Sequence, residues 1–375
     1  HRWGSQSGRK CLSRNGHGCR SSCLQEDAGV GKIKKSTSFK LVDFVWVGSQ
    51  IRGEIMFFQQ FADENFILNN LHKWYGHDCQ ISQLSKGSEN LNYLLDGQLV
   101  VRVLYLAESS PIFSQAFPYL EREVYFVNTL YENKLNPLRY LSFPDGKFIH
   151  RLDVKDGSLF FLKYPYLRGE RMTFSSSNLS ELARKLANIH EFSQRYMMTF
   201  ERVHFYDDLI SSLHFRTFSY NPQLERIVPG YQALWKIFQE NTKALKSMKS
   251  EKRNIFIHND LHDENLLLCE KEVAILDFGD CRYSLPEEDI GTLFWGILQK
   301  VEKSKYEEML NQFFKYYSRP IDKTVCFCYT LQRFLDIHLY YLNENLKEAG
   351  LIKYQKEKFN KEEAMINFLI SKITE

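Results

Sequence analysis

The stretch IHNDLHDENLLL, residues 257–268, crowds histidine, acid and amide side chains between two apolar runs. Taken alone, such a loop fits a metal site, a hydrolase site or a phosphoryl-transfer loop. A zinc site is disfavoured, because His258 and His262 lack the glutamate of a His-Glu-x-x-His helix and have Asp260 between them. The sequence on either side of the loop distinguishes a hydrolase site, a phosphoryl-transfer loop and other metal sites.

The next strand supplies the deciding feature. A short polar turn joins 266–268 to the apolar run 273–276, so the two are expected to pair as a hairpin. That hairpin returns Asp277 to the side of Asn265. One carboxylate and one carboxamide then converge as oxygen ligands, which Mg²⁺ prefers together with substrate phosphates. Asp260 remains free to accept a proton or to orient a hydroxyl nucleophile.

The order of these residues matches the phosphoryl-transfer template of kinases, in which a base aspartate precedes an asparagine and a second, metal-holding aspartate before Phe-Gly. Together with Asp289-Ile290, the segment resembles the aminoglycoside phosphotransferase and choline kinase superfamily more closely than eukaryotic protein kinases. This resemblance implies an α+β, protein-kinase-like two-lobe fold with an antiparallel-sheet N-lobe and a mainly helical C-lobe. It also implies a bacterial type of small-molecule kinase that uses ATP and Mg²⁺.

The segments before the loop resemble the nucleotide-binding lobe of the same superfamily. KGSENLNYLL, 86–95, is similar to the hairpin that covers the nucleotide, and the strand after it carries Arg102. Glu123, on the following helix, is expected to pair with that cation. FFLKYPYLRGERM, 160–172, is similar to the hinge strand whose backbone groups hold adenine. The cofactor-binding residues that the resemblance implies are Gly87, Asn90, Arg102, Glu123, Tyr164, Tyr166 and Leu167.

The resemblance also implies the roles in the loop. Asp260 is expected to act as the base or to orient the acceptor hydroxyl, and His258 to brace the loop. Asn265 and Asp277 are expected to hold Mg²⁺ against the nucleotide phosphates. Positioning and charge stabilisation supply most of the rate in such reactions. Asp280 and Asp289 are expected to be structural, and 262–264 to be mainly a spacer.

Two positions depart from the superfamily pattern. The strand cation is Arg102 where lysine is usual, and a guanidinium binds phosphate as a planar fork and not as a point charge. Asn259 stands where glycine is usual, and asparagine tolerates left-handed backbone angles better than most residues. Neither departure argues against activity.

Apolar periodicity divides the chain into an N-lobe, 56–165, and a helical C-lobe, 166–375. The acceptor site is expected in the C-lobe. In the N-lobe, helices are predicted over 57–75 and 117–134, and strands over 81–86, 91–95, 99–105, 147–153 and 159–165. In the C-lobe, helices are predicted over 178–194, 202–216, 230–248, 286–302, 304–317, 323–348 and 354–373, with short strands in 254–278.

Residues 1–55 show neither helical nor strand periodicity and are rich in Gly, Ser, Arg and Lys. We interpret them as disordered or as a non-native leader, with Met56 as the true start. GVGKIKKST, 29–37, falls short of a P-loop, because the position five before Gly31 is Glu26 and not glycine, and Ile33 follows Lys32. The early cysteines do not have the spacing of zinc ligands.

Composition narrows the function classes for a chain of 375 residues with 43% hydrophobic residues and a net charge of +3. That charge is too mild for a nucleic-acid binder, and no apolar run is long enough to span a bilayer. Eight scattered cysteines without Cys-x-x-Cys spacing suggest reduced thiols and a cytoplasmic protein. The predicted partner is a small-molecule hydroxyl acceptor. A bacterial protein Ser/Thr kinase and a nucleotide-binding pseudokinase scaffold are the alternatives.

Overall fold

The computed structural model describes residues 64–86, 90–109, 113–196, 220–227, 230–248, 255–270, 272–344 and 364–374. All of them belong to one compact unit, Val47–Glu375. The leader predicted over 1–55, Met56, Gly87 and the helix predicted over 202–216 lie outside the described residues.

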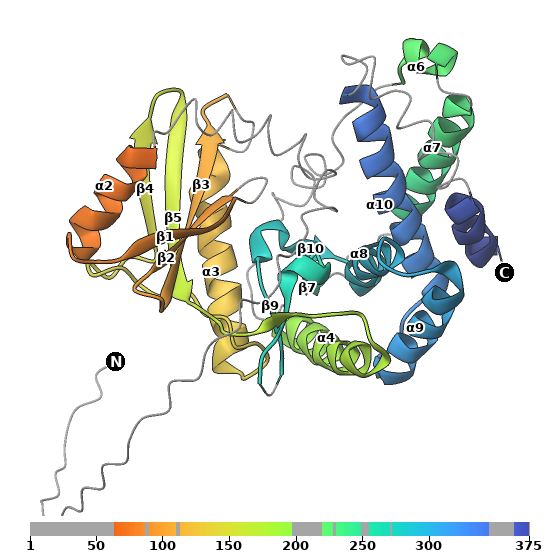
Figure 1. Ribbon diagram of the computed structural model, residues 1–375. Helices are drawn as coiled ribbons and strands as arrows, with labels where there is room; N and C mark the ends of the chain where they lie inside the picture. The colour runs from red at the N-terminus through yellow and green to blue at the C-terminus, as the bar shows by residue number, and fades with distance from the viewer. Residues whose placement is uncertain are drawn as a thin grey trace, which may run out of the picture. The chain divides into compact units, whose positions relative to one another are not determined.

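A five-stranded antiparallel sheet with the order β1-β2-β3-β5-β4 forms the N-terminal part of this unit (Figure 1). The Asp-Gly pair between β2 and β3 takes positive φ angles, 50° at Asp96 and 66° at Gly97. Asp-Gly adopts such angles readily in a tight turn, and the N–H of Gln98 donates to the carbonyl of Leu95 at 3.0 Å across it. The turn lets β2 and β3 pair as an antiparallel hairpin with Leu95 opposite Leu99. The strands are β1 (Ile81–Lys86), β2 (Asn90–Leu95), β3 (Leu99–Ala107), β4 (Ile149–Val154) and β5 (Gly157–Pro165).

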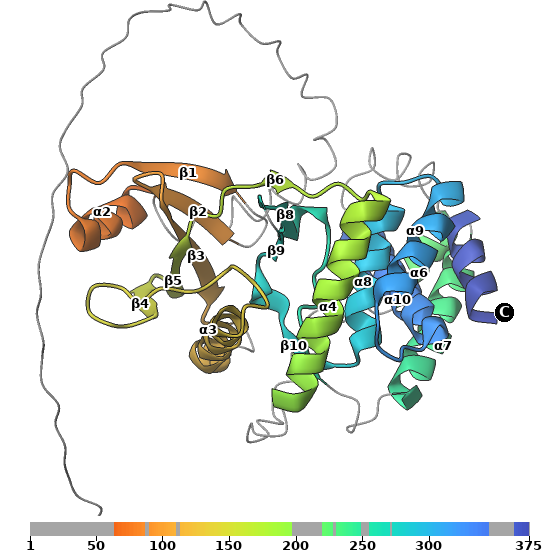
Figure 2. The same cartoon turned by 90° about the horizontal axis from the view of Figure 1, so that it is seen from below.

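Helices α2 (Glu64–Tyr75) and α3 (Ala116–Glu132) lie on opposite faces of this sheet (Figure 2). Strand alternation explains the arrangement, because successive side chains of a strand point to opposite faces. In β5, Phe161 is buried in one cluster with Leu71 of α2, and Phe160 is buried in a second cluster with residues of α3. The same alternation turns Arg102 of β3 toward α3.

The remainder is mainly helical, and its helices begin and end within a few residues of the predicted ranges; the helical parts predicted over 345–348 and 354–363 lie outside the described residues. One short helix, α6 (Pro222–Ile227), was not predicted. The others are α4 (Ser176–Tyr196), α7 (Tyr231–Met248), α8 (Pro286–Leu298), α9 (Lys303–Tyr316), α10 (Lys323–Glu344) and a helix over 364–374. Within the described residues, no helix has the length and apolar character that crossing a membrane demands.

Two small sheets surround the polar loop. Strand β6 joins β8 and β9 in one sheet, and β10 pairs with β7 in the other. The sequence predicted the β8–β9 hairpin but neither β6 nor β10. The strands are β6 (Glu170–Arg171), β7 (Ile255–Ile257), β8 (Leu266–Leu268), β9 (Val273–Ile275) and β10 (Arg282–Ser284); two short 3-10 turns are η3 (Asp263–Asn265) and η4 (Phe278–Asp280).

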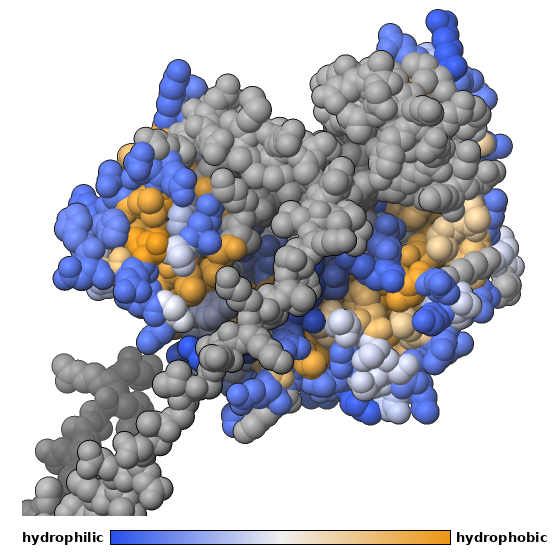
Figure 3. Space-filling model, viewed as in Figure 1, coloured by the Kyte–Doolittle hydropathy of each residue, from blue (hydrophilic) through white to orange (hydrophobic). Residues whose placement is uncertain are grey.

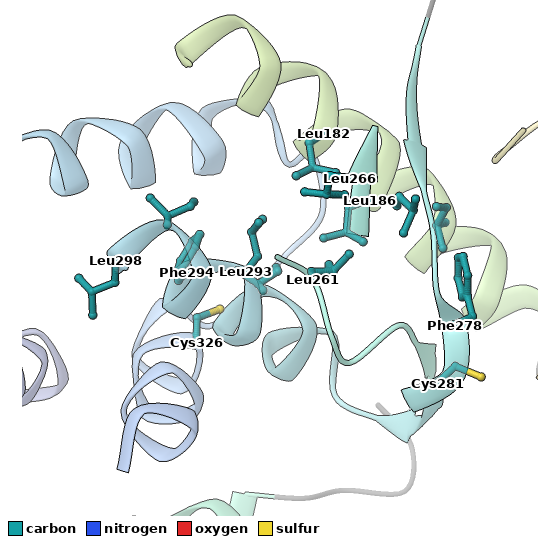
Figure 4. Packing of buried hydrophobic residues seen from close by; sticks show 14 of the residues in the cluster. Leu182, Leu186, Leu261, Leu266, Phe278, Cys281, Leu293, Phe294, Leu298 and Cys326 are labelled. Atoms are coloured by element: carbon teal, nitrogen blue, oxygen red, sulfur yellow. The ribbon is translucent and has the colours of Figure 1, made fainter. Parts of the chain in front are cut away.

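Buried leucines anchor the polar loop to the helical core. Leu261 and Leu266 are fully buried on either side of the η3 turn. Figure 4 shows both between the leucines of α4 (Leu182 and Leu186) and Leu293 of α8. On the face shown in Figure 3, hydrophobic side chains also reach the surface, with hydrophilic ones around them. The leucines hold the loop in place, so its polar residues keep fixed positions.

Candidate active site

His258 ties the loop to the strand that follows it. Its Nε2–H donates to the carbonyl of Leu276 at 2.7 Å, and its Nδ1 accepts from the backbone N–H of Asp260 at 3.1 Å. The ring also lies edge-on to Phe278, with the centroids 4.6 Å apart. His258 therefore bridges the loop and the Asp277 segment, which is the bracing geometry expected from the sequence.

Asp289 at the start of α8 braces the same loop from the other side. Its carboxylate accepts the backbone N–H groups of His258, at 3.1 Å, and of Asn259, at 2.7 Å. Asn259 adopts a φ of 68°, which turns both N–H groups toward the acid. His190 of α4 donates to the same carboxylate at 3.0 Å. Burial raises the pKa of Asp289, but these hydrogen bonds and the histidine charge outweigh it and keep the pKa low.

Asp260 and Asn265 are in direct contact. The Asn265 amide donates to Oδ2 of Asp260 at 3.0 Å and to its backbone carbonyl at 2.9 Å. Because the NH₂ group is used in this way, Oδ1 of Asn265 is the atom left for a cation. The carboxyl of Asp260 also accepts from His262 at 3.2 Å and from Arg333 at 3.0 Å.

The β8–β9 hairpin brings Asp277 back to this cluster. Leu266 pairs with Ile275, and the N–H of Leu276 donates to the carbonyl of Asn265 at 2.8 Å. The next residue, Asp277, takes a left-handed backbone with φ 54° and ψ 75°. Its side chain is 41% exposed and accepts the N–H of Gly279 at 3.3 Å. The hairpin that the sequence predicted thus places Asp277 next to the Asn265 backbone.

Arg102 reaches the same place from the N-terminal sheet. Its Nη1 donates to Oε1 of Glu123 at 2.8 Å and lies 3.3 Å from Oδ1 of Asp277. Tyr140 donates to the same glutamate oxygen. Burial raises the pKa of Glu123, and the opposing charge of Arg102 only partly offsets this. The expected Arg102–Glu123 pair is present, and it is fully buried.

Gly279 makes room for Arg102 to approach Asp277. A Cβ atom at this position would lie 2.5 Å from Nη2 of Arg102 and 3.1 Å from Oδ1 of Asp277. Tyr119 of α3 donates to the Gly279 carbonyl. Any side chain here would push apart the arginine and the aspartate.

His262 and Arg333 were not predicted from the sequence to belong to the site. We expected 262–264 to be mainly a spacer, and this expectation is wrong for His262, which donates to Asp260. Arg333 comes from α10, 73 residues away from Asp260 in the sequence. A loop rich in aspartate can be recognised from its composition, whereas a single arginine in a long helix cannot be recognised as a site residue in this way.

The two acids of the spacer also have specific partners. Asp263 lies 3.2 Å from Lys300, just beyond α8, and Glu264 lies 3.1 Å from Arg171 of β6. Lys300, Arg171 and Glu264 are about half-exposed, so each pair contributes little stability. They connect the loop to β6 and to the end of α8, so the loop is held by its polar residues as well as by its leucines.

The predicted nucleotide contacts outside the loop are only partly available. The N–H of Tyr166 donates to the carbonyl of Gln98 at 2.7 Å, so this one backbone group of 164–167 already has a partner within the protein. Tyr164 and Leu167 keep their expected place at the end of β5 and just beyond it. Asn90 begins β2, and its Oδ1 is buried with no hydrogen-bond partner in the described part of the chain. Gly87 lies outside the described residues.

Known proteins are similar to this chain in sequence pattern and in fold. A model of the "Phosphotransferase enzyme family" matches residues 80–321. No curated protein matches the chain.

Solved structures show the same fold at low sequence identity. An amicoumacin kinase in complex with AMP-PNP and Ca²⁺ has a TM-score of 0.62 and 16% identity, over 80% of this chain and 93% of that one. The GDP and kanamycin complex of APH(2")-IIia has a TM-score of 0.54 and 16% identity, over 80% and 98%. A microcompartment-associated aminopropanol kinase has a TM-score of 0.52 and 18% identity, over 72% and 89%.

These likenesses confirm the predicted α+β kinase-like fold, with its five-stranded antiparallel sheet and helical part. The family model covers well over half of the chain and includes the polar loop and the hairpin. The predicted superfamily resemblance is confirmed as well: this chain belongs to the phosphotransferase enzyme family.

Proposed function

We propose that this phosphotransferase moves the terminal phosphate of ATP to a hydroxyl group of a small molecule, with Asp260 facing that hydroxyl. The contact between Asp260 and Asn265, with the hairpin returning Asp277 beside them, carries the proposal. We also assign the reaction to the cytoplasm, where ATP is available.

Asp260 mainly orients the acceptor hydroxyl and contributes little as a base. Burial raises the pKa of its carboxyl, but the hydrogen bond from His262 and the charge of Arg333 outweigh burial and hold the pKa well below its usual range. A carboxylate of such low basicity does not remove a hydroxyl proton before phosphate transfer begins. In a loose transition state the proton leaves late, so holding the hydroxyl oxygen in line with the phosphate is the larger contribution.

Asn265 and Asp277 fit a magnesium site that the nucleotide completes. In the described residues, no three His, Cys, Asp or Glu side chains converge as a metal site. Mg²⁺ commonly uses one or two carboxylates plus substrate phosphates, which suits one carboxylate and one amide oxygen. When bound there, Mg²⁺ would neutralise the charge on the phosphates. The half-exposed Asp277 side chain leaves its carboxylate accessible for this purpose.

Arg102 is suited to the nucleotide phosphates. Its guanidinium is buried against Glu123 and points at Asp277, so its position is fixed before any ligand binds. A planar guanidinium can donate two parallel hydrogen bonds to phosphate oxygens. We assign it to the α- and β-phosphates.

The named relatives support a small-molecule acceptor. An amicoumacin kinase and an aminopropanol kinase share the fold, and a third relative holds GDP together with kanamycin. AMP-PNP and GDP in these structures fit a nucleotide donor. They leave the choice between ATP and GTP to experiment.

The release of ADP from Mg²⁺-ATP tests the proposal. A panel of small hydroxyl compounds should contain at least one that stimulates release above the rate without acceptor. Asp260→Ala and Asp277→Ala should each remove the stimulated release while the protein stays folded. Asp153→Ala, which removes an exposed aspartate of β4, should leave it unchanged. Full activity in both site variants would refute the assignment.

A further inference from the structure

We propose that the acceptor carries an anionic group, such as a carboxylate or a phosphate, and that Arg333 binds this group beside Asp260. The inference rests on the proposed function, because it identifies the acceptor class of the same site. It selects hydroxy acids or phosphorylated alcohols over amino alcohols and amino sugars.

Arg333 has unused hydrogen-bonding capacity at the reaction centre. Its Nη2 donates to Oδ1 of Asp260 at 3.0 Å, which is its only hydrogen bond within the described part of the chain. Its side chain is 25% exposed, so one edge of the guanidinium is accessible to a ligand. An arginine carries five N–H donors in a planar fork whose shape matches a carboxylate or a phosphate. A group bound to this fork would lie next to the Asp260 carboxylate.

A close helix crossing determines where Arg333 lies. At Gly291 of α8, an added Cβ would lie 2.5 Å from Cβ of Tyr329 and 3.0 Å from the backbone nitrogen of Thr330. The hydroxyl of Thr330 donates to the Gly291 carbonyl at 3.2 Å. Arg333 comes three residues after Thr330, nearly one turn further on the same helix face. The backbones of α8 and α10 are locked together one turn away, so Arg333 is held near Asp260.

Trp295 of α8 supports the guanidinium from one side. The Cζ atom of Arg333 lies 5.6 Å from the centre of the Trp295 ring. A cation over an aromatic face is stabilised there, and the flat ring limits the orientations of the guanidinium. The fork is thus oriented before an acceptor arrives.

The charges next to Asp260 disfavour a cationic acceptor. Arg333 and His262 are the groups that act most strongly on Asp260, and both are basic. The nearest acid on α10 is Asp336, which is almost fully buried, and burial raises its pKa well above the usual range. A positively charged acceptor would have to share the Asp260 carboxylate with Arg333 and His262, which already contact it.

Glu288 of α8 already has its own hydrogen-bond partners. It accepts from Arg282 of β10 and from the hydroxyl of Ser284. Asp277, on the nucleotide side, faces Arg102 at 3.3 Å. Among the described residues, both carboxylates of the reaction centre, Asp260 and Asp277, thus have an arginine as their partner. Because each carboxylate is paired with a positive charge, the reaction centre suits an anionic acceptor group.

Two anions could use Arg333: the acidic group of the acceptor and the phosphoryl group during transfer. Arg102 from the sheet already faces the nucleotide side through Asp277. Arg333 comes from α10 in the helical part and contacts Asp260, the residue assigned to the acceptor hydroxyl. The structure therefore favours the acceptor's own group.

A binding experiment distinguishes the acceptor's acidic group from the transferred phosphoryl group as the partner of Arg333. The enzyme is first saturated with Mg²⁺-AMP-PNP, which fills the phosphate side. Matched pairs of compounds are then titrated and followed by ligand-observed NMR: glycolate with ethanolamine, glycerate with 3-amino-1,2-propanediol, and gluconate with glucosamine. At least one acid should bind more tightly than its amine partner. Tighter binding of the amines throughout, or no binding of any acid, would overturn the proposal.

Variants of Arg333 make the test specific. Arg333→Gln should weaken binding of the preferred acid about 10- to 100-fold, as expected for the loss of a charged hydrogen-bonding partner. Arg333→Lys should give an intermediate loss, since it keeps the charge without the fork. Arg195→Gln removes an exposed arginine paired with Glu191 and should change nothing. Unchanged binding of AMP-PNP by each variant shows that the protein is folded.

Turnover of the same compounds distinguishes failure of the inference from failure of the proposed function. Arg333→Gln should raise KM for the acid far more than it lowers kcat. An equal loss of kcat with acidic and neutral acceptors, at unchanged binding, would mean that Arg333 acts on the phosphoryl group, and the proposal would fall. If acids bind through Arg333 but no compound is phosphorylated, the anion site stands and the proposed function falls.

Discussion

Nη1 of Arg102 lies 3.3 Å from Oδ1 of Asp277, although the two residues come from the sheet and from the hairpin after the polar loop. The same nitrogen donates to the buried Glu123 at 2.8 Å. One arginine therefore links a fully buried acid to the carboxylate proposed to hold Mg²⁺. Stability and the proposed nucleotide binding both depend on this residue, and the two can be separated experimentally.

Replacing Arg102 alone should damage the fold as well as nucleotide binding. Arg102→Met leaves the Glu123 carboxyl buried without its cation, which typically costs about 3–5 kcal/mol of unfolding free energy. The double variant Arg102→Met/Glu123→Leu removes both partners and should recover most of that loss. It should still bind ATP poorly, because the phosphate-binding cation is absent. Urea unfolding and nucleotide titration measure the two effects. Tight ATP binding by the double variant would contradict the role of Arg102.

Gly279→Ala should weaken nucleotide binding and cost some stability. The new methyl group would clash with Nη2 of Arg102, which is buried against Glu123, and would press on Asp277, which is half-exposed and can shift. We expect the Kd for Mg²⁺-AMP-PNP to rise by at least about tenfold, which corresponds to ~1.4 kcal/mol. Calorimetric titration, with Tm as a control, tests this. An unchanged Kd would show that the Arg102–Asp277 approach is not needed for binding.

Asp289→Ala should lower kcat without abolishing folding of the helical part. The change leaves the N–H groups of His258 and Asn259 without their acceptor, and a buried unsatisfied donor costs about 1–3 kcal/mol. The loop that carries Asp260 then loses its fixed backbone. Hydrogen exchange should show faster exchange at 258–260 than in the parent protein. Equal exchange rates would mean that the leucine anchors alone hold the loop.

The predicted effect of Asp336 on stability depends on pH. Burial raises the pKa of its carboxyl, so the folded protein keeps a proton that the unfolded chain releases near pH 4. The contribution of Asp336 to the free energy of unfolding therefore falls as the pH rises from about 4 toward the pKa that Asp336 has in the folded protein. Asp336→Asn removes this loss and keeps an oxygen to accept from Gln332. The Tm of the variant should exceed that of the parent by a margin that widens between pH 5 and pH 7.5; a constant margin would contradict this.

The local part of the site was predictable from the sequence. Asp260, Asn265 and Asp277 lie within one loop and one hairpin, and a short hairpin brings together residues that are close in the chain. The positive φ angles of Asp96 and Gly97 follow from the residue types themselves. Motif spacing carries this information because few backbone paths connect such close positions.

The long-range part could not be predicted. Arg333 reaches Asp260 only because α8 and α10 cross closely at Gly291, and nothing in the spacing of α10 reveals that contact. His262 was predicted as a spacer because a histidine between loop residues has no pattern of its own. The backbone groups of 164–167 were expected to hold adenine, and the hydrogen bond from the Tyr166 N–H to Gln98 depends on how the chain continues after β5. Packing between distant elements, not local pattern, decides all three.

The central claim is that Asp260 directs the terminal phosphate of ATP to a small-molecule hydroxyl. The most direct measurement follows the label from γ-³²P-ATP in the presence of Mg²⁺ and a defined panel of hydroxyl compounds, for the parent protein and for Asp260→Asn. We predict that label enters a small molecule with the parent protein, and that Asp260→Asn transfers none although it still binds AMP-PNP. Label on protein alone, or equal transfer by the two proteins, would contradict the account.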